Sequence, residues 1–416
     1  MKQKLMFAAV LAALGTTVAH AQSSVTLYGL IDEGISYTNS VSTTAGGRSL
    51  VKMADGLMQS NRWGMRGAED LGGGLKAIFV LENGYNLSSG KLGQGGREFG
   101  RNAYVGLSSG QFGTVTLGRQ NEFMYESISR FSLVTGNNGG GNIFAHTMDN
   151  DNLIGSFRVN NAVKYVSPTY LGLQGGAMYA FSNAAGGFGN NRLYSFNLQY
   201  NQGPIAAALA YTQMNQALST ITAAGPTLGL GQATNTNGAV DSDSTSSDQA
   251  LTAGRQRIFG GGLKYTFGPA KVGFVITDSK YDNTVGFTAG ATSLSLANSA
   301  YMHFTNYEVN ATYNLTPALL VGGAYTYTSG KFSSALGSVS PDWNQVGLFS
   351  DYSLSKRTDV YLAANWLHLN GGLASKTATG GVATGFQGAL GTTSVAGGAA
   401  TTANQVVVGA GIRTRF

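Results

Sequence analysis

The sequence contains no cysteine, only six prolines among its 416 residues, and only 11% charged residues. Without cysteine the chain forms no disulfide, no thiolate metal site and no cysteine nucleophile. The formal net charge is +6, but no basic cluster alternates with aromatic residues, so nucleic acid is not an expected partner. Beyond the N-terminus, no apolar run has the length that a membrane-spanning helix needs.

Signals for catalysis and for metal or cofactor binding are weak. After residue 21 the histidines are His146, His303 and His368, and their spacing matches no metal site. Gly106–Gly110 fits the nucleophile-elbow pattern, but a strand rather than a helix follows it. Asp241–Asp248 resembles a calcium-binding loop but lacks its central glycine and terminal glutamate. This favours a solvated loop tip, with cation bridging to lipopolysaccharide as the alternative. We expect no cofactor, no bound metal and no enzyme.

The first 21 residues have the three parts of a secretory signal peptide. Lys2 and Lys4 are positively charged, Leu5–Leu14 is an apolar run, and Ala19–Ala21 is a small-x-small cleavage site. The apolar run is too short to span a bilayer as a helix. We therefore expect cleavage after residue 21 and one domain over residues 22–416, with a retained anchor as the alternative.

Glycine and aromatic residues are abundant, with 61 Gly, 20 Tyr and 20 Phe. This composition suits strands and turns rather than helices. From residue 24 onward, segments of about ten alternating residues are joined by connections that are short and long in turn. Sixteen such segments are expected, over residues 25–37, 57–68, 75–87, 98–108, 112–120, 158–167, 170–182, 192–200, 204–214, 256–267, 270–281, 303–314, 318–329, 343–353, 357–369 and 404–416.

An even number of strands with tight turns on one side and long loops on the other is typical of an outer-membrane β-barrel. A propeller or sandwich would not give this asymmetry, and no blade-like repeat is present. Several strands alternate cleanly: in the last one, Val408 and Ile412 oppose Gln405 and Arg413. The sequence predicts an all-β fold, a transmembrane antiparallel β-barrel of sixteen strands.

The hairpin over residues 60–85 indicates which face of the barrel is wet. Arg62 and Arg66 share one face of its first strand, and Trp63 and Met65 share the other. Because arginine at the lipid face costs about 2–4 kcal/mol at mid-membrane, the arginine face is expected to point into a water-filled lumen. Other charged residues expected to line the lumen are Glu82, Arg119, Lys264, Glu308, Arg413 and Arg415.

Glu33 does not follow this alternation. It falls in phase with the apolar residues Leu27, Ile31 and Ile35, on the face assigned to lipid. A position at a subunit interface or after a β-bulge would each explain it.

Several motifs resemble those of the general diffusion porins of Gram-negative outer membranes. Ser24–Asp32 is similar to the first strand of that family, and Arg62–Ala77, Gly100–Leu107, Phe112–Arg119 and the terminal Phe416 also match it. The resemblance covers essentially the whole mature chain. It implies a homotrimer in the outer membrane, in contact with lipid and lipopolysaccharide, whose barrels pass ions and small hydrophilic solutes by passive diffusion. It further implies that the barrel-assembly machinery recognises Phe416.

The resemblance also implies a constriction, where the long third loop, residues 121–157, folds inward against arginines on the wall. By motif the wall positions are Arg62, Arg101 and Arg158, and arginine keeps its charge at any relevant pH. The middle of the loop is rich in Gly and Asn, and its carboxylates lie toward its ends, so we expect a mild preference for anions. The expected constriction residues are Arg62, Arg66, Arg101, Arg158, Glu122 and Glu126.

Functions of other classes remain open at this point. The protein could be a surface adhesin or anchor with a plugged barrel. Trimming its external loops would then abolish adhesion without any loss of conductance. A substrate-specific channel would carry an ordered track of binding residues through the lumen. An outer-membrane lipase would need a Ser/His constellation, which the sequence lacks.

Overall fold

The computed structural model describes residues 24–43, 46–135, 140–183, 185–189, 191–215, 220–222, 225–227, 251–289, 292–334, 337–371, 375–376, 382–383 and 400–416. The expected signal peptide and the acidic stretch Asp241–Asp248 lie outside these residues. Within them, no helix has the length and apolar character needed to cross a membrane.

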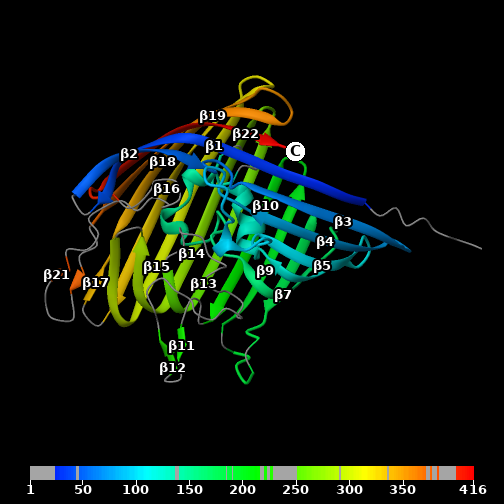
Figure 1. Ribbon diagram of the computed structural model, residues 1–416, viewed down its shortest axis with the longest axis horizontal. Helices are drawn as coiled ribbons and strands as arrows, with labels where there is room; N and C mark the ends of the chain where they lie inside the picture. Colours follow the sequence, from blue (N-terminus) through cyan, green and yellow to red (C-terminus); the bar gives the residue numbers. More distant parts are fainter. Residues whose placement is uncertain are drawn as a thin grey trace, which may run out of the picture.

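Antiparallel strands form one closed sheet, in which most neighbouring strands are consecutive along the chain (Figure 1). The wall consists of β1 (Ser24–Thr43), β2 (Gly46–Asp55), β3 (Arg62–Gly72), β4 (Leu75–Gly84), β5 (Asn102–Ser109), β6 (Gly113–Gln120), β7 (Val159–Val166), β8 (Leu173–Ala180), β9 (Arg192–Gln202), β10 (Ile205–Asn215), β13 (Leu251–Phe267), β14 (Ala270–Ala289), β15 (Thr292–Asn314), β16 (Leu319–Ser334), β18 (Asp342–Ser353), β19 (Thr358–Asn370) and β22 (Asn404–Arg415). Small pairings are added by β11 (Thr220–Thr222), β12 (Gly225–Thr227), β17 (Gly337–Val339), β20 (Ser375–Lys376) and β21 (Val382–Ala383).

The barrel closes where the first strand meets the last. Residues Leu30–Thr38 of β1 pair with residues Val407–Arg415 of β22. The other edge of β1 pairs with both β2 and β3, which together count as one wall strand. The wall therefore has sixteen strands, and the predicted fold class is confirmed.

The second wall strand is interrupted at residues 56–61, where the sequence predicts a continuous strand over 57–68. Asp32 of β1 accounts for the interruption, because its Oδ2 accepts hydrogen bonds from the backbone N–H groups of Met58 (3.1 Å) and Gln59 (2.7 Å). Backbone donors satisfied by a buried carboxylate do not need a neighbouring strand. The chain leaves the sheet here, and the Met58 side chain becomes fully buried.

At one edge of the barrel the strands run further than predicted. β14 continues to Ala289 and β15 starts at Thr292, so most of the expected connection 282–302 is paired strand. The β1–β2 hairpin likewise pairs as far as Thr43 and Gly46. Extended pairing satisfies backbone groups that an open loop would leave to water. At the opposite edge the turns are short, as predicted.

The two faces of the wall differ as the alternation predicts. On β13, Phe259 and Leu263 are 45% and 52% exposed on the outer face, while Ile258 is fully buried. On β22, Val408 and Ile412 are exposed and Arg413 is buried. An outer face of large apolar side chains is the surface that a barrel presents to lipid.

Glu33 lies on this outer face, half-buried. The hydroxyl of Ser88, in the connection between β4 and β5, donates to Glu33 Oε1 at 2.9 Å. The register shift in β1 falls between Thr38 and Val41, beyond Glu33, so a bulge does not explain its position.

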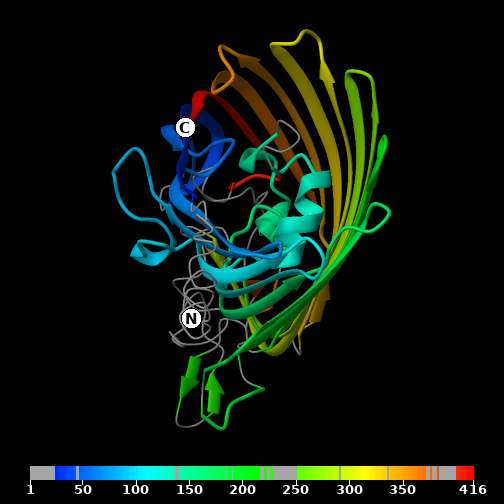
Figure 2. The same cartoon turned by 90° about the vertical axis from the view of Figure 1, so that its right-hand side faces the viewer.

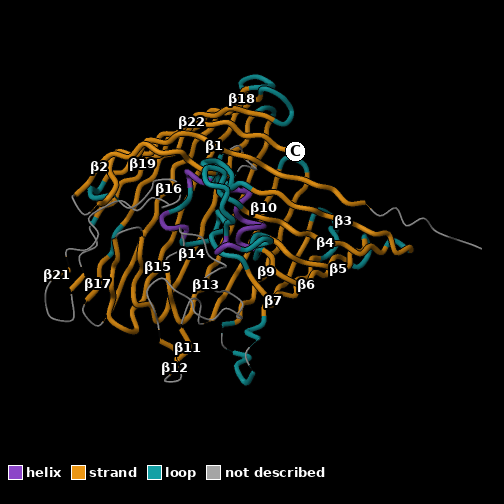
Figure 3. The backbone as a smooth tube through the Cα atoms, in the orientation of Figure 1, coloured by secondary structure: helices purple, strands orange, loops and turns teal. Residues whose placement is uncertain are grey.

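We call residues 121–157 the 121–157 segment. Its described residues, 121–135 and 140–157, form short helical turns and loops rather than strands (Figure 3). Figure 2 shows the segment, coloured cyan to green, between the blue strands near the N-terminus and the green and yellow strands opposite. Its apolar side chains pack on buried wall residues of β7–β10, β13 and β14. The turns are η2 (Met124–Ile128), η3 (Ser129–Phe131), η5 (Asn142–Phe144) and η6 (Thr147–Asp149); η1 (Gln94–Gly96) lies in the β4–β5 connection.

Gly262 of β13 makes room for this packing, because a Cβ there would lie 2.5 Å from Cγ of Phe131. We expect Gly262→Leu to displace the segment and to cost about 1–3 kcal/mol of stability, as overpacking does. The measurements are the unfolding midpoint in detergent and the single-channel conductance, which should rise as the segment moves.

Gly261→Leu provides the matched control. A Cβ at Gly261 would lie on the outer face, 3.3 and 3.5 Å from side-chain atoms of Leu209 and Ile276 and 4.0 Å from the Ala208 carbonyl oxygen. Equal midpoints and equal conductances for the two variants would contradict this packing role.

Candidate pore constriction

Arg62, Arg101 and Arg158 come from distant parts of the sequence and lie along adjoining cavities. Arg62 begins β3, and the other two directly precede β5 and β7. A cavity of about 240 Å³ is lined by Arg62 and Arg101, and a second of about 540 Å³ by Arg101 and Arg158. The structure thus brings together the three wall arginines that the sequence singles out.

Arg101 is held by Glu82 of β4. Its Nε donates to Glu82 Oε1 at 2.7 Å, and both side chains are buried. Asn102 Nδ2 donates to the same oxygen at 3.2 Å, and the Tyr28 hydroxyl donates to Oε2 at 2.9 Å. The Glu82 carboxylate is therefore fully engaged in positioning one arginine.

Arg62 and Arg158 are held without a carboxylate. Arg62 Nη1 donates to the Ser60 carbonyl at 3.0 Å, and Arg158 donates to the Gly155 carbonyl. The Arg158 guanidinium also lies 5.4 Å from the ring centre of Tyr125, a cation–π distance. Among the described residues neither arginine forms an ion pair, so both keep their full charge toward the cavities.

The 121–157 segment also lines the first cavity, through Tyr125, Glu126, Ser129 and Arg130 among others. Glu126 Oε1 also accepts from Lys164 Nζ at 2.7 Å, so its charge is balanced locally. The sequence reasoning missed Tyr125 and Arg130. The four-residue spacing of Glu126 and Arg130, which places both on one face of a helical turn, is a signal that would have found the arginine.

A third cavity, of about 600 Å³, continues along β3 toward its turn with β4, and Arg66 lies there rather than in the first cavity. It shares Gln59 and Arg62 with the first cavity, which in turn shares Ser60 and Arg101 with the second. Each cavity is lined, among the described residues, by three cationic side chains and one carboxylate. These are Arg62, Arg101 and Arg130 with Glu126; Lys52, Arg101 and Arg158 with Asp55; and Arg62, Arg66 and Arg415 with Glu82.

The comparisons with known proteins agree with this wall of strands and its charged series of cavities. A family model for Gram-negative porins matches residues 8–372. The chain belongs to the Gram-negative porin family. The predicted outer-membrane location and the predicted family are thereby confirmed, and the family and fold together point to a channel.

Relatives of this porin are outer-membrane proteins. It is 36% identical to an outer membrane porin protein of Bordetella pertussis, over 56% of this chain and 65% of that protein. It is 32% identical to outer membrane porin protein 32 of Delftia acidovorans, over 72% and 76% of the two chains. Among solved structures, an anion-selective porin from Comamonas acidovorans shares the fold, with a TM-score of 0.65, 23% identity and coverage of 95% of this chain and 100% of that chain.

Glu122 of this porin lines none of the three cavities. It is fully buried and accepts hydrogen bonds from the Tyr125 backbone (3.0 Å), Asn152 Nδ2 (2.8 Å) and the Thr212 hydroxyl of β10 (2.6 Å). The structure therefore places Glu122 beneath the segment, where it fastens the segment to the wall.

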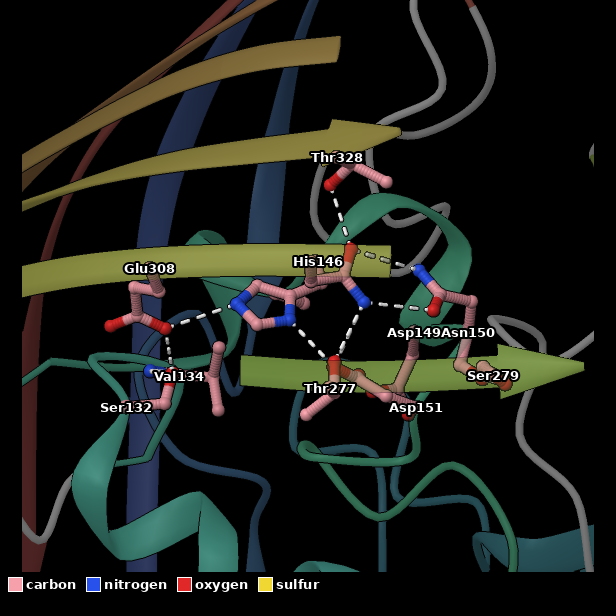
Figure 4. Close-up of polar contacts among 12 residues, drawn as sticks. Ser132, Val134, His146, Asp149, Asn150, Asp151, Thr277, Ser279, Glu308 and Thr328 are labelled. Atoms are coloured by element: carbon pink, nitrogen blue, oxygen red, sulfur yellow. Dashed lines mark hydrogen bonds and ion pairs between the residues drawn. The ribbon is translucent and has the colours of Figure 1, made fainter. Parts of the chain in front are cut away.

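Glu308 of β15 fastens the porin's segment at a second point (Figure 4). Its Oε1 accepts from the Leu133 backbone at 2.8 Å, and its Oε2 lies 3.0 Å from His146 Nε2. His146 Nδ1 lies 2.6 Å from Asp151 Oδ2, which also accepts from the Thr277 hydroxyl of β14 at 2.6 Å. We call His146, Asp151, Glu308 and Thr277 the histidine clamp; all four are essentially without solvent exposure.

The remaining predicted lumen charges of the porin are engaged away from the first two cavities. Arg413 pairs with Asp351 (2.5 Å) and Asp359 (3.0 Å). Lys264 Nζ lies 5.6 Å from the ring centre of Phe131, and Arg119 Nε donates to the Gly100 carbonyl at 2.8 Å. Within the described residues, no group of histidine and acidic side chains has an arrangement suited to a metal ion.

Proposed function

We propose that this porin is a general diffusion channel for ions and small hydrophilic solutes, with a mild preference for anions and no enzymatic activity. The observation that carries this proposal is the excess of cations in each of the three cavities. Fixed charges lining a narrow wet passage set its ion preference, and arginine remains charged at any relevant pH. The Comamonas protein that shares the fold is itself named as anion-selective.

The positions of the acidic residues support the direction of this preference. Of the segment's four carboxylates, Glu122, Asp149 and Asp151 are fully buried, and only Glu126 lines a cavity. Asp151 is paired with His146, and neither Glu122 nor Asp149 lines any of the three cavities, so these carboxylates do not lie along the path of a passing ion. The wall arginines consequently face a weak opposing charge.

We also propose that the 121–157 segment folds into the lumen and narrows the pore. In support, its contacts reach strands far apart around the wall. The Asn142 side chain donates to the Gly56 carbonyl at 2.9 Å, and the side chains of Gln345 and Asn365 donate to segment carbonyls at 3.0 and 2.9 Å.

The assembly that we propose is a homotrimer, formed after removal of residues 1–21 and inserted among outer-membrane lipids and lipopolysaccharide. An outer-membrane protein of Vibrio cholerae with a similar fold, at a TM-score of 0.58 and 15% identity, has a solved trimer form. Phe416, which the barrel-assembly machinery would recognise, is 47% exposed and exchanges backbone hydrogen bonds with Gly29 at 3.0 and 3.2 Å.

The proposed selectivity is tested by reversal potentials of single channels under a potassium chloride gradient. Arg62→Gln/Arg158→Gln is the informative double variant, because removing Arg101 would leave the buried Glu82 carboxylate unpaired. We expect a wild-type potential that favours chloride, three conductance steps per trimer, and a change of about two- to fivefold toward potassium in the variant.

Lys356→Gln, in the exposed turn between β18 and β19, removes a charge outside the cavities and should leave the potential unchanged. If the double variant has the same reversal potential as wild type, Arg62 and Arg158 do not set the ion selectivity. Folded protein without conductance would support a plugged barrel, such as an adhesin or anchor, and overturn the channel.

A further inference from the structure

The third cavity combines arginines with tyrosine rings. Tyr28 of β1 and Tyr104 of β5 line it together with Arg62, Arg66 and Arg415. Arginine forms paired hydrogen bonds with carboxylates, and an aromatic face attracts another ring. A cavity of about 600 Å³ lies in the size range of small-molecule binding sites.

The cation best placed to receive a ligand is Arg66. Its side chain is exposed, its guanidinium lies 5.4 Å from the ring centre of Tyr28, and among the described residues it forms no ion pair. Arg415, by contrast, already pairs with Asp359 at 2.7 Å.

The one carboxylate of the cavity does not compete for Arg66. Both oxygens of Glu82 are engaged, one by Arg101 and Asn102 and the other by the Tyr28 hydroxyl. The Tyr28 ring is held in place by this same hydrogen bond. The cavity therefore offers an uncompensated guanidinium next to a fixed aromatic ring.

We propose that the third cavity is a binding site for small aromatic carboxylates, which it retains as they pass along the channel. Arg66 binds the carboxylate, and the rings of Tyr28 and Tyr104 contact the aromatic ring of the solute. Inorganic anions and short aliphatic carboxylates meet the same charge but gain nothing from the rings. The retention of solutes during passage rests on the proposed channel function, whereas the binding itself does not.

Benzoate and acetate are the probes, since they differ in the ring. Titration calorimetry of the folded barrel in detergent measures binding without conduction, and blockades of single-channel current measure retention. We expect benzoate to bind at least about tenfold more tightly than acetate and to interrupt the current when it is added on the side of the short turns.

Three variants separate the contributions of charge and ring. Arg66→Gln should weaken benzoate binding about tenfold. Tyr104→Leu should weaken it about fivefold, while Tyr104→Phe, which keeps the ring, should stay within about twofold of wild type. Lys356→Gln again provides the charge control.

The outcomes distinguish the two proposals. Equal binding of benzoate and acetate, or benzoate binding unaffected by both Arg66→Gln and Tyr104→Leu, overturns the binding site even in a channel that prefers chloride. Benzoate binding that depends on Arg66 in a barrel without conductance overturns the channel and keeps the site.

Discussion

Replacing Glu308 with alanine is expected to release one end of the 121–157 segment from the wall. The substitution removes the acceptor for the Leu133 backbone N–H and leaves His146 beside Asp151 alone. Breaking a buried, hydrogen-bonded charge pair by removing one partner costs about 3–5 kcal/mol. We expect a lower unfolding midpoint, and channels with larger and noisier currents as the segment moves.

The control for this variant is Glu33→Ala, which removes a glutamate from the outer face, where it accepts one hydrogen bond from Ser88. Glu308→Gln should have an unfolding midpoint between those of wild type and Glu308→Ala, because its amide oxygen still accepts a hydrogen bond from the Leu133 backbone. If Glu308→Ala keeps the wild-type midpoint and the wild-type current noise, the clamp does not hold the segment.

Alkaline pH is expected to loosen the same region. Burial by itself would lower the pKa of His146, but the Asp151 and Glu308 carboxylates outweigh it and raise that pKa to about 10. A histidine whose pKa is higher in the folded state stabilises the fold fully below about pH 6.5 and loses this contribution as the pH rises through its folded pKa. The loss should amount to about 2–4 kcal/mol between pH 7 and 10.

Asp149, next to the clamp, acts in the same direction. Burial, together with the neighbouring Asp151 charge, raises the pKa of Asp149 to about 8, so its carboxyl is neutral at pH 7. The unfolded chain loses this proton near its ordinary pKa of 3.8, whereas the folded chain holds it up to about pH 8. The stability contribution of Asp149 therefore falls as the pH rises toward 8 and is constant above that pH.

The measurement is the free energy of unfolding of the barrel between pH 6 and 10, for wild type, His146→Asn and His368→Asn. His146→Asn should be less stable at pH 7 and should lose the decline in stability above about pH 8, keeping the decline at lower pH that is due to Asp149. His368, partly exposed and hydrogen-bonded to Asn370 and Asn404, serves as the matched histidine. An unchanged slope in His146→Asn would exclude the clamp as the source of the pH dependence.

The wall of the barrel was predictable because its physical constraints are local. Strand side chains alternate with a period of two, and lipid on one side with water on the other separates apolar from charged positions such as Ile412 and Arg413. The strand predicted over residues 57–68 was wrong at its start. The backbone N–H groups of Met58 and Gln59 donate to the carboxylate of Asp32, about 26 residues earlier, instead of to a neighbouring strand. Alternation along one strand carries no information about such a partner.

The roles of the acidic residues in the 121–157 segment were harder to predict. Glu122 was expected at the constriction as a carboxylate near the start of the loop, yet in the structure it accepts hydrogen bonds from Thr212 and Asn152. Asp151 similarly meets Thr277. Whether a carboxylate faces an ion path or a buried hydroxyl depends on contacts such as that between Asp151 and Thr277, which are 126 positions apart and which local patterns do not encode.

The contacts of the 121–157 segment also set an order of events during assembly. Its anchors on the wall include Thr277, Glu308, Gln345 and Asn365, the last of which is 222 residues from its partner Ile143. Contacts of such long range form late in folding, because the intervening chain must first be ordered. The segment can reach its final position only after β19 has joined the sheet. A chain halted before that strand would lack the contact of the 121–157 segment with Asn365, so the last part of the sequence fixes the final position of the segment.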